Sequence, residues 1–191
     1  MKKEFSFGGV KSGQIFQMGL VVPDADASMR FYAETMGVGP FTCKRGFKAP
    51  DGWYRGKSDM PELTLAMAYS GQVVIEVIQQ HDDTPSVYKE FIDKHGYGLH
   101  HFGVAVAGEE YDKTLKEYHD IGFEDVFTDT LPSGARIYYI SPKADAARTA
   151  FRNESGVGYL ELVEIIDSEQ SFLKSVYDSA ANWDGKTVVR A

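Results

Sequence analysis

The chain has 191 residues, of which 43% are hydrophobic and 13% aromatic, enough to bury the core of one large domain or of two small fused modules. Its formal net charge of -8, with no stripe of Lys or Arg, excludes a surface for nucleic acid or anionic membranes. Cys43 is the only cysteine, which excludes an internal disulfide and a cysteine-cluster zinc site. We expect no signal peptide, no membrane span and a cytoplasmic location.

The first elements are a loose N-terminal arm over residues 1–13 and a strand over 15–22. Asp24 or Asp26 can cap a following helix that extends through residues 32–36, because its apolar residues recur at helical spacing. Gly37 supplies a natural end for this helix.

Residues 39–61 are irregular, apart from a short strand at 41–44, and loops of this length inside a compact domain are usually functional or disordered. Strands over 62–69 and 72–80 follow and form a hairpin.

The second half of the chain repeats this order. A linker helix over 85–96 joins the halves, and the remaining elements are a strand at 99–106, a helix at 109–121, strands at 125–129, 135–140 and 158–166, and a C-terminal helix at 168–181. Each half therefore has the order β-α-β-β-β, and we expect one domain over 14–167, made of modules 14–80 and 99–166, before a C-terminal helix and tail at 168–191.

The two halves carry polar side chains at matching points. Gln17 and His101 open the two modules 84 positions apart, and each is followed, 59 and 60 positions later, by an acid inside an apolar strand, Glu76 and Glu161. Two halves that fold alike would place these four groups equivalently, so a pseudo-twofold axis could bring them to one point. An ionised carboxylate buried without a partner costs several kcal/mol, so each acid needs a cation, hydrogen bonds or a raised pKa.

The doubled order and four short segments resemble the vicinal oxygen chelate superfamily, which includes glyoxalase I, methylmalonyl-CoA epimerase, extradiol dioxygenases and bleomycin-resistance proteins. The segments are QMGLVVPDADASMRFYAETMGVGPF, VVIEVIQ, HHFGVAV and YLELVE, and the resemblance covers residues 14–166. It implies an α+β fold in which two tandem βαβββ modules form a cupped mixed sheet around a metal-binding cavity. It also implies a homodimer and a small-molecule substrate.

Carried over residue by residue, the resemblance implies Gln17, Glu76, His101 and Glu161 as metal ligands, a set similar to that of eukaryotic-type glyoxalase I. One amide oxygen, one imidazole and two carboxylates suit a divalent Zn, Ni, Co, Mn or Fe ion. The set departs from the triad of two histidines and one carboxylate of non-haem iron oxygenases, because its first member is a glutamine.

The implied activity is that of a metal-dependent lyase or epimerase, which removes a proton next to a carbonyl and stabilises the resulting enediolate. Glu161 and Glu76 are the candidate catalytic bases. Two alternatives stay open: a metal-free protein that binds or sequesters a small molecule, and an iron-dependent dioxygenase, which Gln17 disfavours. The buried acids favour the first reading, because an apolar binding cleft has no need of them.

Two loop residues complete the expected site, and the orientation of the neighbours of His101 and Glu161 is also predicted. Trp53 and Arg55, in the long loop, are expected to cover the cavity mouth and to bind substrate, Arg55 through its two-pronged donor geometry. Strand alternation predicts that His100 points away from His101, and that Glu164 faces away from Glu161 into solvent. Small residues such as Gly19 and Gly103, beside the polar positions, are expected to leave room for a ligand.

Overall fold

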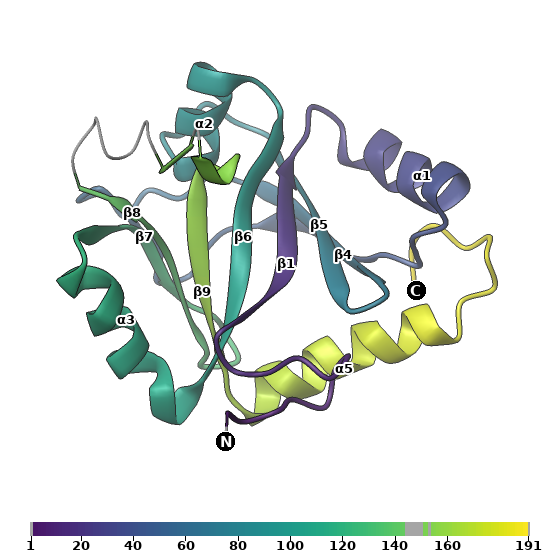
Figure 1. Cartoon of the computed structure of the whole chain (residues 1–191). Coiled ribbons are helices and arrows are strands. Elements are labelled where there is room, and N and C mark those ends of the chain that lie inside the picture. Colours follow the sequence, from purple (N-terminus) through teal and green to yellow (C-terminus); the bar gives the residue numbers. More distant parts are fainter. Residues whose placement is uncertain (1, 144–150, 153, 191) are drawn as a thin grey trace.

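The computed structural model describes residues 2–143, 151–152 and 154–190 (Figure 1). Its strands are β1 (Gln14–Val21), β2 (Thr42–Phe47), β3 (Trp53–Tyr54), β4 (Leu63–Ser70), β5 (Val73–Gln80), β6 (Gly98–Ala107), β7 (Phe123–Thr130), β8 (Arg136–Pro142) and β9 (Tyr159–Ile165). Its helices are α1 (Ala25–Met36), α2 (Val87–His95), the 3-10 turn η1 (Gly108–Glu110), α3 (Tyr111–Asp120) and α5 (Asp167–Ala181). Among these helices, none is long and apolar enough to cross a membrane.

One mixed sheet contains all the named strands, in the order β2-β4-β5-β1-β6-β9-β8-β7-β3. The order is mirrored about its centre: β1 pairs with β5 in parallel, β6 pairs with β9 in parallel, and β1 and β6 join the halves antiparallel. Figure 1 shows this sheet strongly curled. The structure thus confirms the expected α+β fold with a cupped mixed sheet.

In each half, the connection between the first and second strands contains a helix on the convex side of the sheet, α1 in the first half and α3 in the second. Helix α1 begins at its N-cap Asp24, whose side chain accepts a hydrogen bond from the Ala27 amide, and ends at Gly37 in the left-handed conformation. Its Ala25 and Met29 pack on β4 and β5, while α3 packs Tyr111 on β6 and β9. With α1 and α3 outside, the other side chains of each strand face the concave side.

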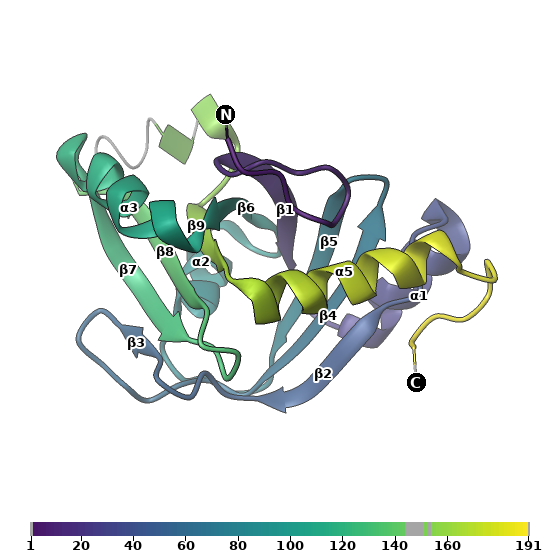
Figure 2. The ribbon, with the colours of Figure 1, turned by 90° about the horizontal axis from the view of Figure 1, so that it is seen from below.

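Helix α5 lies across one end of the cup, beneath strands of both halves (Figure 2). Its buried Leu173 and Val176 pack with residues of β1, β5, β6 and β9. Phe5 and Phe7 of the N-terminal arm are in the same cluster and only 3% and 0% exposed. The expectation of a loose arm is therefore wrong for this segment. Its apolar residues alternate with polar ones, and they pack in the same cluster as the buried face of α5.

The two-residue strand β3, which no pattern in the sequence predicted, determines how the cup is closed. β2 lies at one edge of the sheet and β3 at the other, where it pairs with β7. Only residues 48–52 connect them, a segment that spans at most about 20 Å. The sheet must therefore curl until its edges face each other, and residues 48–55, here called the strap, cross the opening.

The strap is fastened to helix α2 through Glu90. This carboxylate accepts hydrogen bonds from the Tyr54 hydroxyl at 2.7 Å, from Arg55 Nε at 3.0 Å and from Lys94 Nζ at 2.8 Å. Arg55 has a φ of 44°, in the left-handed region that non-glycine residues rarely adopt, and its ion pair with Glu90 helps to hold it there. Burial alone would raise the pKa of Glu90, but Lys94, Tyr54 and Arg55 together lower it to about 2.

Glu90→Gln is expected to lower the free energy of unfolding by about 1–3 kcal/mol at pH 7, because it removes a charge that accepts hydrogen bonds from three side chains. A carboxylate with a depressed pKa stabilises the fold above its unfolded pKa of 4.5 and loses that contribution as the pH falls toward 2. Urea unfolding at pH 7 and pH 3 should therefore give a smaller difference between variant and wild type at pH 3. Glu117→Gln, on the exposed side of α3, is the control. An equal difference at both pH values would contradict this account.

Candidate metal centre

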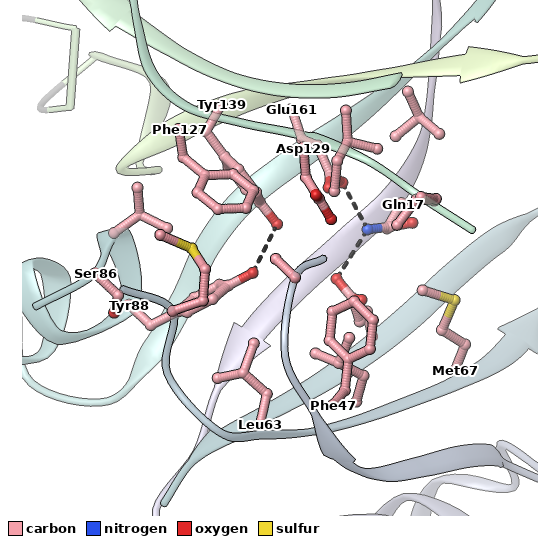
Figure 3. Close-up of a pocket in the computed structure, with 18 of the residues that line it drawn as sticks. Gln17, Phe47, Leu63, Met67, Ser86, Tyr88, Phe127, Asp129, Tyr139 and Glu161 are labelled. Carbon is pink, nitrogen blue, oxygen red and sulfur yellow. Dashed lines mark hydrogen bonds between the residues drawn. The ribbon is translucent and has the colours of Figure 1, made fainter. Parts of the chain in front are cut away.

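Four side chains from one chain meet on the concave face of the two central strand pairs. Gln17 Nε2 lies 2.9 Å from Glu76 Oε2, 2.9 Å from Glu161 Oε2 and 3.1 Å from His101 Nε2. His101 Nε2 lies 3.4 and 3.3 Å from the same two carboxylate oxygens. Each of these residues is at most 5% exposed. The structure thus brings together all the ligands that the sequence implied, and Figure 3 marks two of the hydrogen bonds of the Gln17 nitrogen with dashed lines.

Strand register explains why they meet. Gly19 of β1 pairs with Glu76 on one side and His101 on the other, and Gly103 of β6 pairs with Gln17 and Glu161. A Cβ on Gly19 would lie 1.8 Å from the His101 ring, and one on Gly103 would lie 2.8 Å from Gln17 Cβ. The room at each glycine is therefore used by the polar side chain of the neighbouring strand, and not by a ligand as the sequence suggested.

His100 does not point away from His101, and a β-bulge is the reason. The pairing of β1 with β6 shifts at two places, leaving Phe16 as the extra residue of β1 and His100 as the extra residue of β6. These positions are equivalent in the two halves, one residue before Gln17 and His101. The bulge breaks the alternation of faces, and His100 Nδ1 lies 2.9 Å from His101 Nδ1. The histidine doublet was the only trace of this in the sequence.

His100 determines which nitrogen of His101 faces the acids. His100 Nε2 lies 3.3 Å from the Val87 carbonyl, which can only accept, so this nitrogen carries the hydrogen. His100 Nδ1 is then an acceptor and receives the hydrogen of His101 Nδ1. His101 Nε2 therefore faces Gln17, Glu76 and Glu161, where it either carries a proton or offers its lone pair to a cation. Hydrogen bonds of this kind, behind a histidine ligand, set its tautomer and orientation in metal sites.

The carboxylates of Glu76 and Glu161 meet in a buried site, where an uncompensated charge is unfavourable. Burial raises the pKa of Glu76, and the negative charge of Glu161 adds to the increase, although a hydrogen bond with His101 opposes it. Burial alone would lower the pKa of His101, but Glu161 and Glu76 raise it to about 9. The acids therefore draw positive charge to this point, from a proton on His101 or from a bound cation.

The donor set fits a divalent metal ion. The Gln17 amide nitrogen has two hydrogens, but three acceptor atoms lie within 3.1 Å of it, so the amide cannot satisfy all of them. Turning the amide over would place its oxygen, a metal ligand, at the same point. The ligand atoms of Glu76, His101 and Glu161 all lie within 4.8 Å of one another. An amide oxygen, an imidazole and two carboxylates would hold Zn, Ni, Co, Mn or Fe.

The cluster lies at the base of a cavity between the two halves (Figure 3). The empty space is about 780 Å³, part of which is open to solvent. Its wall comes from both modules, from the start of α2 and from α5, and is largely apolar or aromatic. The polar lining includes Gln17, Glu76, Asp129, Glu161 and Glu169.

The loop residues predicted to bind substrate lie at the strap. Neither Trp53 nor Arg55 lines the cavity, while Tyr54 between them does. Trp53 is 43% exposed, and Arg55 pairs with Glu90. Their role in substrate binding stays a prediction.

The expectation that Glu164 is solvent exposed is wrong. It does lie on the opposite face from Glu161, but it is only 7% exposed. Arg136 Nε and Nη2 donate to its two oxygens at 2.9 and 2.8 Å, and the same guanidinium lies 4.4 Å from the centre of the Tyr111 ring. No pattern in the sequence indicated that β8 would place an arginine beside it.

A family model described as Glyoxalase/Bleomycin resistance protein/Dioxygenase superfamily matches residues 16–139. The chain belongs to this superfamily. The match includes Gln17, Glu76 and His101 and ends before Glu161, which the fold supplies from β9. No curated protein matches the chain.

Solved structures show the same superfamily fold at low sequence identity. A methylmalonyl-CoA epimerase variant from Streptomyces coelicolor, in complex with 2-nitronate-propionyl-CoA, is 20% identical, with a TM-score of 0.57 over 83% of this chain and 98% of that one. A methylmalonyl-CoA epimerase from Mycobacterium tuberculosis is 18% identical, with a TM-score of 0.54 over 83% and 91%. A hypothetical protein from Bacillus halodurans C-125 is 18% identical, with a TM-score of 0.57 over 82% and 97%. These similarities support the fold alone.

His100→Phe is expected to weaken zinc binding by about 10- to 100-fold, because a ring of similar shape removes the acceptor that orients His101. Competition with a chelating dye measures the affinity. His95→Phe, at the exposed end of α2, is the matched control and should bind zinc as wild type does. Unchanged affinity in a folded His100→Phe protein would show that His100 does not position His101.

Proposed function

We propose that the chain is a metal-dependent lyase or epimerase that removes a proton from a carbon next to a carbonyl. The observation that carries the proposal is the convergence of two buried carboxylates, one from each half, with the His101 imidazole at the base of a largely apolar cavity. The superfamily includes enzymes, and the similar solved structures include epimerases. Low identity leaves the reaction itself as our inference.

The proposed cofactor is a divalent Zn, Ni, Co, Mn or Fe ion held by Gln17, Glu76, His101 and Glu161. When bound, it would supply positive charge beside the carbonyl oxygen and so stabilise the anion formed by proton loss.

Glu161 and Glu76 are the proposed bases. One of them accepts the proton of the C–H bond, whose electron pair passes into the adjacent carbonyl to give an enediolate or enolate. In a lyase or isomerase, the same carboxylic acid returns the proton to the neighbouring carbon. In an epimerase, the second carboxylic acid protonates the opposite face.

One observation favours a second candidate, a metal-free binding protein. The Gln17 amide already joins both acids, and His101 can carry the proton that balances them. In that case the cluster would serve as a structural bridge between the halves, and the cavity would bind a small molecule without changing it. A dioxygenase is less well supported, since Gln17 replaces the second histidine that such iron sites use.

Metal content separates the two candidates. The purified protein, after reloading, is expected to hold one divalent ion per chain by elemental analysis, and Glu161→Gln and His101→Ala are expected to lose it. Glu117→Gln, on the convex side, should retain it. A wild-type protein that takes up no ion after reloading would favour the binding protein.

Deuterium exchange tests the reaction. In D2O without oxygen, the metal-loaded protein should exchange the carbon-bound proton of 2-hydroxyacetophenone or of an acyl-CoA, and Glu161→Gln should slow this by about 100-fold or more. Mass spectrometry follows the exchange. A metal-loaded protein that exchanges neither type of compound would contradict the proposed proton abstraction, and a requirement for oxygen would point to the dioxygenase.

A further inference from the structure

The cavity has a second polar point besides the metal-centre cluster. Asp129, near the end of β7, lines the cavity and is only 2% exposed (Figure 3). Its Oδ1 accepts a hydrogen bond from the Asp51 amide of the strap at 3.0 Å. Its Oδ2 is buried and has no donor in hydrogen-bond geometry among the residues that the structure describes, although the neighbouring Thr130 amide favours the charged form of the group. Half of this carboxylate therefore lacks the contacts that a buried charge needs.

Burial of the Asp129 carboxylate is unfavourable for the stability of the fold. Burial raises its pKa, and although amides of Asp51 and Thr130 oppose this, the nearby charge of Asp51 adds to the increase. Fixing the strap would explain Oδ1 alone, and an asparagine could do that with its carbonyl oxygen. A buried acceptor that the fold itself does not use is a candidate for contact with a ligand.

Strand register places Asp129 at a distance from the metal centre that one small molecule could span. Asp129 pairs with Ile137, and Ile137 pairs with Val163, two residues beyond Glu161 on β9. Two strand spacings and two residues separate the Cα atoms of Asp129 and Glu161 by roughly 10–12 Å. A molecule with one ring and a short polar chain spans such a distance.

The cavity wall restricts the charge of the ligand. Among the residues that the structure describes, four acids line it, Glu76, Asp129, Glu161 and Glu169, and no Lys or Arg does. Most of the rest is apolar or aromatic, including Phe47, Leu63, Leu65, Phe127 and Tyr139. An anionic group beside Asp129 would meet its negative charge in a place of low dielectric constant, whereas a neutral or cationic donor would be favoured.

We propose that the cavity binds a neutral or cationic, ring-sized apolar molecule whose hydroxyl or amino group donates a hydrogen bond to Asp129 Oδ2. The opposite end of the molecule carries the carbonyl and adjacent oxygen, and this part rests on the proposed function. It follows that an acyl group with a free carboxylate is a poor ligand for this cavity.

Calorimetry with four 2-hydroxyacetophenones tests the proposal, with hydroxyl, aminomethyl, methoxy or carboxylate at the para position. Zinc-loaded and metal-stripped protein are both titrated. Wild type is expected to bind the hydroxyl and aminomethyl compounds at least about tenfold more tightly than the other two, the effect of one hydrogen bond to a charged acceptor. Asp129→Asn, which keeps an acceptor for the Asp51 amide, is expected to reduce the preference to about twofold or less.

Asp51→Asn is the matched control, because it removes an exposed charge beside Asp129 without changing the cavity wall, and it should keep the preference. Asp129→Ser replaces Asp129→Asn if the latter does not fold. The proposal is overturned if the carboxylate compound binds most tightly, if the preference persists without Asp129, or if no compound binds either form of the protein.

Binding and deuterium exchange measured with the same compounds distinguish this proposal from the proposed function. A preference that depends on Asp129, with no deuterium exchange, would support the binding site and remove the catalytic reading. Exchange without any such preference would do the opposite.

Discussion

The structure depends on how two carboxylates are neutralised at one buried point. Glu76 and Glu161 approach the same imidazole and the same amide from opposite sides, and neither is more than 5% exposed. In a low-dielectric interior their repulsion would destabilise the junction between the halves unless one of them held a proton or positive charge lay between them. A protonated His101 or a cation can supply it, and only the cation leaves a reactive centre at the base of the cavity.

The neighbouring strands leave room for the side chains of the metal centre. Gly19 and Gly103 have no Cβ, so that His101 and Gln17 can lie across them, and an equivalent bulge precedes each of these polar residues. Helix α2 takes part at two points, since the Val87 carbonyl fixes His100 and Glu90 fastens the strap. The mouth of the cavity and the orientation of its imidazole are thus attached to one helix.

Much of this could be predicted from the sequence, because it depends on patterns that repeat. The doubled order of elements, the caps of α1 and the approach of Gln17, Glu76, His101 and Glu161 follow from periodicity and matched spacing. What could not be predicted depends on contacts between distant segments. The bulge at His100 breaks the rule of alternation used to place it, Arg136 covers Glu164 from another strand, and β3 is too short to leave a pattern. The acceptor at Asp129 was missed because nothing in its local sequence, FTDTL, indicates burial.

The equivalent bulges carry different residues, Phe16 in the first half and His100 in the second. A site built from two identical subunits would have to carry the same residue on both sides, and a mutation would alter both at once. Covalent fusion removes that restriction. The second half could acquire a histidine behind its metal-centre residue while the first half kept a phenylalanine at the equivalent position. The nearly symmetric centre therefore has different surroundings on its two sides. A substrate entering it would find two similar acids in dissimilar surroundings, which is the condition for treating the two faces of a planar carbon differently.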